Sequence, residues 1–119
     1  MRLQRRNQRQ HDRKAVLREI KKEHAAFKYR ILTGTVHEAY DSCRQICFYE
    51  SLHEYFLYGG HTSRAFIEAA AGRGGILGEL WEMYLKNENL GADTWEEIET
   101  MLQEYTERHM PQERMEVQE

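Results

Sequence analysis

The single proline of this chain, Pro111, lies close to its end, and no segment alternates β-branched with polar residues. Proline lacks an amide donor and clashes with the preceding helical turn, so the long stretch before Pro111 is free of the strongest helix breaker. Apolar residues recur there at intervals of three and four, the repeat of a helix with one buried face. The pattern predicts an all-α fold, a compact bundle of about five helices in one domain.

Capping residues and glycines set the expected helix limits. Residues 1–11 are expected to form a basic N-terminal arm, residues 12–110 the helical domain, and residues 111–119 a polar tail. Capping pairs such as Thr35 with Glu38 combine a hydroxyl and a carboxylate that satisfy the first amides of a helix. The helices are expected from about Asp12 or slightly earlier to Leu32, from Val36 to Gly59, from Thr62 or Ser63 to the turn at residues 72–75, from Ile76 to Leu90, and from Asp93 or Thr94 to Pro111.

The second expected helix is the longest uninterrupted one, and we place it at the centre of the bundle. Its apolar stripe includes Val36, Tyr40, Cys43 and Cys47. A free cysteine packs as a small apolar residue, and a reducing compartment keeps both thiols, so we expect no disulfide. Either other helices cover this helix on all sides, or its further aromatic residues form a partner surface or a homodimer seam. Those aromatic residues are Phe48, Tyr49, Tyr55 and Tyr58.

Charge is divided between the two parts of the chain. Through Arg30, eleven Lys and Arg residues accompany three acids, whereas six accompany seventeen acids in the remainder. Such asymmetry is typical of proteins that bind a polyanion or a charged partner. The N-terminal arm contains one sizeable apolar residue, so we expect it to be flexible when free. Its candidate contacts to nucleic-acid phosphates or to an acidic partner are Arg2, Arg5, Arg6, Arg9, Arg13 and Lys14.

A solubilising terminus is the alternative interpretation of the arm, because no recognised DNA-binding or RNA-binding motif accompanies it. The last expected helix is acidic, with an inner stripe of Trp95, Ile98, Leu102 and Tyr105. Its carboxylates lie about one turn apart and can imitate a row of phosphates or dock on a basic groove, although a solvated face is the alternative. The candidate partner-binding residues are Glu96, Glu97, Glu99, Glu104 and Glu107.

No combination of residues indicates catalysis. The side chains that could bind zinc include no Cys-x-x-Cys pair, and the two cysteines fall on the apolar stripe. We therefore expect neither enzymatic activity nor a metal or cofactor. The weak zinc-ligand candidates are Cys43, Cys47, His37, His53 and His61.

No apolar run approaches the roughly 20 residues that a membrane-spanning helix needs. The Arg-rich start is also not followed by the apolar segment of a secretion signal. We therefore expect a cytoplasmic protein without membrane contact.

Three runs in the middle of the chain carry a resemblance: EHAAF at residues 23–27, EAYD at 38–41 and LGELWEMYL at 77–85, together with Glu50. In these runs, and in the spacing of its apolar and aromatic positions, the chain resembles a small uncharacterised helical domain family of gut bacteria, their phages and mobile elements. That family has no established catalytic or binding residues, so none is transferred to this chain.

The resemblance implies a mobile-element setting inside a host bacterial cell, where small non-enzymatic proteins often bind and disable host defences. Our leading hypothesis is therefore an anti-CRISPR-like inhibitor, an interaction protein that binds a CRISPR nuclease or its nucleic-acid channel through charged surfaces. The alternative is a nucleic-acid-binding accessory or regulatory protein that uses the Arg-rich arm. A homo-oligomeric module is a third hypothesis.

Overall fold

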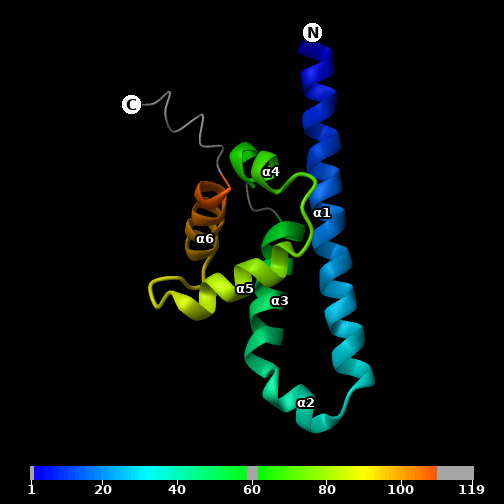
Figure 1. The fold of residues 1–119 in the computed structure, drawn as a ribbon, viewed down its shortest axis with the longest axis vertical. Coiled ribbons are helices and arrows are strands. Elements are labelled where there is room, and N and C mark those ends of the chain that lie inside the picture. Colours follow the sequence, from blue (N-terminus) through cyan, green and yellow to red (C-terminus); the bar gives the residue numbers. More distant parts are fainter. Residues whose placement is uncertain (1, 59–61, 110–119) are drawn as a thin grey trace.

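A computed structural model describes residues 2–58 and 62–109, with side chains from residue 7 onward. All regular elements in these ranges are α-helices, which confirms the predicted all-α bundle (Figure 1). The tail at residues 111–119 and the glycines at the predicted end of the second helix lie outside the described residues. The helices are α1 (Arg2–Thr33), α2 (Val36–Asp41), α3 (Cys43–Tyr58), α4 (Arg64–Ala70), α5 (Ile76–Lys86) and α6 (Trp95–Arg108).

Helix α1 is the longest element, and it begins at Arg2, so the predicted start near Asp12 is wrong. Residues 2–11 continue the helix because Arg and Gln are good helix formers and neither glycine nor proline interrupts them. The 32 residues of α1 rise by about 48 Å. In Figure 1 the first turns of α1 extend beyond the other helices. The predicted arm is therefore a helical extension of the bundle.

The second predicted helix is divided at Ser42 into α2 and α3, so its prediction as one helix is wrong. The Ser42 amide donates to the carbonyl oxygens of both Glu38 and Ala39, at 3.0 and 3.2 Å. This shared hydrogen bond tightens the last turn of α2 toward 3₁₀ geometry. The Ser42 carbonyl then accepts from the Ile46 amide at 2.9 Å, which starts the bonding of α3.

The predicted burial of the stripe through Val36, Tyr40, Cys43 and Cys47 is also wrong. Val36 and Tyr40 are 88% and 77% exposed, and both cysteines are exposed. Helix α2 lies at one end of the molecule, below the region that α5 and α6 cover in Figure 1. An apolar stripe becomes a core only where another element packs on it, and here the side chains face solvent.

The core lies where α1 and α3 meet α4, α5 and α6. The sequence left open whether Phe48, Tyr49, Tyr55 and Tyr58 of α3 are covered by other helices. Phe48, Tyr49 and Tyr55 are buried, whereas Tyr58 is 71% exposed. These burials favour a helix covered on several sides over an aromatic partner surface. The fully buried Phe66 of α4 lies between α3 and α6 in this core.

Helix α6 follows its predicted inner stripe with one exception. Ile98, Leu102 and Tyr105 are buried, but Trp95 is 48% exposed, so its predicted burial is wrong. Trp95 is the first residue of α6, where only one edge of its ring reaches Tyr55, with ring centroids 6.0 Å apart. Burial extends instead to both flanks of the stripe, at Met101 on one side and Thr106 on the other, because five residues turn a helix by about 140°.

Helices α1 and α5 are joined by a partly buried polar contact. The Glu23 carboxylate accepts hydrogen bonds from the amides of Ile76 and Leu77, at 3.1 and 2.9 Å. These amides open α5, and Gly75, the residue before them, has a left-handed conformation and provides no side-chain cap. Glu23 therefore caps α5 from a distant part of the sequence. Burial raises the pKa of Glu23, although the two amide bonds oppose this shift.

The local caps follow their predicted pairs closely. Thr94 and Glu97 form a complete capping box at the start of α6, which confirms Thr94 of the two predicted starting residues, Asp93 and Thr94. Ser63, the second of two predicted caps for α4, accepts from the Phe66 amide at 3.1 Å. Thr35 accepts from the Glu38 amide in the same way.

Candidate functional site

The buried face of α1 changes from apolar to cationic toward its N-terminus. Val16, Ile20 and Phe27 are buried against the bundle. Steps of three and four residues continue this same face to Arg13 and Arg9, which are exposed. The apolar part packs on the core, and the arginine part lies beside α4. Arg9 and Arg13 therefore lie on the side of α1 that faces α4.

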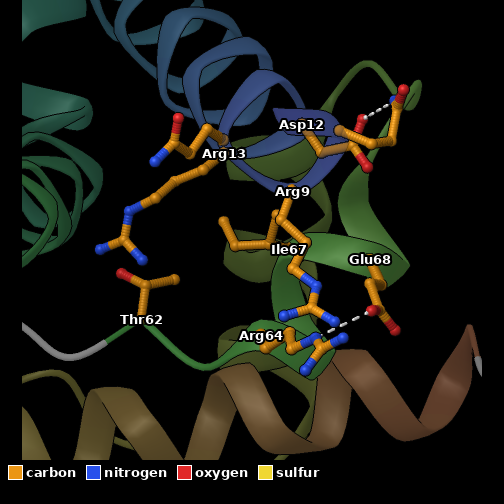
Figure 2. A pocket seen from close by; sticks show the side chains of 9 residues that line it. Arg9, Asp12, Arg13, Thr62, Arg64, Ile67 and Glu68 are labelled. Carbon is orange, nitrogen blue, oxygen red and sulfur yellow. Dashed lines mark hydrogen bonds and ion pairs between the residues drawn. The ribbon is translucent and has the colours of Figure 1, made fainter. Parts of the chain in front are cut away.

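A surface hollow of about 670 Å³ lies between α1 and α4. Figure 2 shows Arg13 extending toward Thr62, and Arg9 extending toward Arg64 of α4. We call this feature the arginine hollow. The residues that line it are Gln8, Arg9, Gln10, Asp12, Arg13, Thr62, Arg64, Ile67 and Glu68.

The two carboxylates of the arginine hollow are engaged within their own helices. Asp12 accepts from the Gln8 amide at 3.0 Å, and Glu68 pairs with the Arg64 guanidinium at 3.4 Å. Among the side chains that the structure describes, neither Arg9 nor Arg13 forms an ion pair with a carboxylate. Their guanidinium groups are therefore available to an anion from outside.

The structure distributes the predicted basic residues among three places. Arg9 and Arg13 line the arginine hollow, where Arg64, which the sequence did not single out, joins them. Lys14 lines a different groove, between α1 and α3. The side chains of the remaining predicted residues, Arg2, Arg5 and Arg6, lie outside the described part of the structure.

The acidic row on α6 is only partly free. Glu96, Glu99 and Glu107 are exposed, and the Glu99 carboxylate also interacts with the Tyr55 hydroxyl. Glu97 accepts from both the amide and the hydroxyl of Thr94, so this carboxylate serves the capping box. Glu104 is half-buried. The outward row therefore consists of Glu96, Glu99 and Glu107, and we call it the acidic row.

One buried polar cluster was not predicted. His24 of α1 is 5% exposed, its Nε2 lies 3.2 Å from Glu50, and its ring stacks on His53 of α3 at 4.6 Å. Burial lowers the pKa of His24, although Glu50 opposes this shift. The cluster joins α1 to α3. The lowered pKa favours the neutral form of the His24 imidazole. His24 continues the stripe of Ile20 at a spacing of four, which is the signal that predicts its burial.

The described residues show no group of three or more His, Cys, Asp or Glu side chains arranged as metal ligands. Among the zinc-ligand candidates, His37 pairs with Asp41 at 3.3 Å, and His61 lies outside the described residues. Within the same ranges, no helix is long and apolar enough to cross a membrane.

Comparison with known proteins finds no matching family model, no significantly similar curated protein and no significantly similar solved structure. The arginine hollow and the acidic row are therefore interpreted from their own chemistry.

Proposed function

We propose that this protein is a non-enzymatic nucleic-acid-binding protein that contacts phosphates with the N-terminal part of α1. The observation that carries the proposal is the convergence of Arg9, Arg13 and Arg64, from two helices, on one surface hollow. The planar guanidinium group matches the oxygens of a phosphate with two parallel hydrogen bonds.

The helical state of the arm strengthens this proposal. A disordered arm loses conformational entropy when it binds, whereas a preformed helix holds its arginines in place beforehand. The formal net charge of the chain is −3, but binding to phosphates depends on the local field, and three arginines line the hollow beside the two carboxylates of Asp12 and Glu68. Each phosphate contact also releases condensed counterions, which makes the affinity depend steeply on salt.

Replacing Arg9 and Arg13 together with glutamine is expected to weaken nucleic-acid binding to a similar extent for all sequences. Glutamine keeps a similar helix propensity and removes only the charge. The slope of log affinity against log salt is expected to fall by about two, one for each lost phosphate contact. Fluorescence anisotropy with labelled DNA and RNA over a series of salt concentrations measures this slope.

A matched control removes two exposed cations elsewhere, Lys86 and Arg108, with the same substitutions. This control is expected to keep the wild-type slope. Equal slopes for the wild-type protein and the Arg9 and Arg13 variant would contradict the proposal, as would the absence of binding to any nucleic acid at low salt.

A second candidate function is binding to a basic protein surface, and the acidic row on α6 favours it. Glu96, Glu99 and Glu107 lie on one face of a helix that a complete capping box stabilises, so the row is preformed. With the mobile-element setting that the family resemblance implies, the proposed partner is the nucleic-acid channel of a CRISPR nuclease. Carboxylates spaced by about one and two helical turns would occupy the positions of phosphates there.

Replacing the three acids of this row with glutamine is expected to abolish inhibition of a guide-dependent nuclease in a DNA cleavage assay. The control is the corresponding replacement of Glu82 and Glu88, which are exposed on and after α5. Two results would exclude this candidate function. In the first, the variant with the changed acidic row still inhibits the nuclease. In the second, the wild-type protein inhibits DNA cleavage by none of the nucleases tested.

A further inference from the structure

A second hollow lies on another side of α1, between α1 and α3, with a volume of about 450 Å³. We call it the α1–α3 groove. Three cations of α1 line one side of it, apolar residues line its floor, and no carboxylate belongs to its lining. The lining residues are Lys14, Leu17, Arg18, Ile20, Lys21, His53, Phe56 and Leu57.

The cations of the groove form a row along the helix. Lys14, Arg18 and Lys21 are separated by four and three residues, which corresponds to a rise of about 6 and 4.5 Å. None of the three pairs with a carboxylate among the described side chains, whereas the neighbouring Lys22 and Lys28 pair with Glu19 and Glu50. Like charges at these spacings destabilise a helix, so a bound anion would relieve a repulsion that the free protein retains.

The floor of the groove is apolar and partly exposed to water. Leu57 is 45% exposed, and Leu17 and Phe56 are half-buried. The Phe56 ring contacts Tyr55 and Phe66 on the core side, with centroid distances of 5.3 and 6.0 Å, so its other side is directed to the groove. An apolar or aromatic group placed on this floor would remove it from water.

The groove therefore suits a ligand that carries anionic groups at short intervals beside flat, weakly polar groups. We propose that the α1–α3 groove binds single-stranded nucleic acid, with backbone phosphates on the cation row and one base on Phe56. This inference rests on the proposed nucleic-acid binding by α1 and specifies the form of nucleic acid that the protein prefers. In a duplex the bases are stacked inside, so the floor would have no base to contact.

The arginine hollow and the groove are neighbours along α1, because Arg13 lines the first and the next residue, Lys14, lines the second. A strand that leaves the arginine hollow can continue along the helix to Lys21 without crossing a carboxylate of the groove lining. Positively charged grooves with aromatic side chains are the usual design of proteins that bind single strands with little sequence preference.

The test uses the full chain and labelled oligonucleotides of one sequence, offered as a single strand and as a duplex. Replacing Lys14, Arg18 and Lys21 with glutamine is expected to lower the affinity for the single strand by about tenfold and its salt slope by about two. Duplex binding, which relies on the arginine hollow, is expected to change much less. The matched control carries glutamine at three exposed cations outside both hollows, Lys22, Lys86 and Arg108.

A second variant, Phe56→Leu, tests the base contact separately. Leucine keeps an apolar side chain but cannot stack a base, so single-strand affinity is expected to fall several-fold while the salt slope stays at the wild-type value. Circular dichroism checks that the helices are retained.

Two results would overturn the groove proposal. If the change in Lys14, Arg18 and Lys21 weakens single-strand and duplex binding equally, or weakens neither, while the Arg9 and Arg13 variant still lowers the salt slope, the groove is excluded and nucleic-acid binding stands. If the wild-type protein binds neither form at low salt, both proposals are wrong.

Discussion

Replacing Phe66 with alanine is expected to lower the free energy of unfolding by about 3–5 kcal/mol, the usual cost of removing a buried aromatic ring. The side chain is fully buried, and its ring lies 6.0 Å from Phe56 of α3 and 5.3 Å from Tyr105 of α6. Helix α4 has seven residues and is too short to be stable alone, so its packing depends on this contact. The loss therefore combines a cavity with a loosened helix.

Urea unfolding followed by circular dichroism measures this loss. Phe66→Leu, which keeps most of the apolar volume, is expected to cost clearly less, and Arg64→Ala, on the exposed side of α4, is expected to stay within about 0.5 kcal/mol of wild type. A Phe66→Ala variant with near wild-type stability would show that α4 does not join α3 and α6 as described.

Replacing Glu23 with alanine is expected to lower the free energy of unfolding by about 2 kcal/mol, because hydrogen bonds to a charged acceptor are worth about 1.5–3 kcal/mol. The substitution leaves the amides of Ile76 and Leu77 without their acceptor in a partly buried place. Gly75 offers no side chain as a replacement. The start of α5 therefore loses its cap and its link to α1 together.

The same unfolding measurement tests this expectation, with Glu82→Ala, on the exposed side of α5, as the control. Glu82 is exposed and forms no ion pair with a described side chain, so its loss is expected to have little effect. Equal effects of the two substitutions would contradict a capping role for Glu23.

The pH dependence of stability tests the surroundings of Glu23 as well. Burial raises its pKa above the usual 4.5, so the folded protein takes up its proton at a higher pH than the unfolded chain does. The wild-type protein is therefore expected to gain stability relative to a Glu23→Gln variant as the pH falls through this raised pKa.

Local patterns predicted local structure well in this chain. The capping box of Thr94 and Glu97 and the cap at Ser63 each join residues three positions apart. Both partners therefore lie within one short segment of the sequence, where they can be recognised. The burial of Val16 and Ile20 follows from helical spacing in the same way. The exposed Cys43 shows the limit of the method, because spacing identifies an apolar face but not whether another helix covers it.

The candidate site was predictable in its charges but not in its geometry. Arg9 and Arg13 were identified from composition, whereas their neighbour Arg64 comes from a helix about fifty residues later. Lys14 directly follows Arg13, yet it lines the other groove, because one residue turns a helix by about 100°. The helical state of residues 2–11 was missed, although Arg and Gln favour helices even without a core to pack on.

The continuity of α1 between its apolar and cationic parts has a consequence for how the chain can vary. Because Arg9, Arg13 and Val16 share one face of an unbroken helix, the direction of the arginines is fixed by the number of residues between them and the core. One inserted residue after Lys14 would keep the composition, the charge and the helix, yet would rotate the arginines by about 100° away from α4. Length in this segment is therefore under tighter constraint than residue identity.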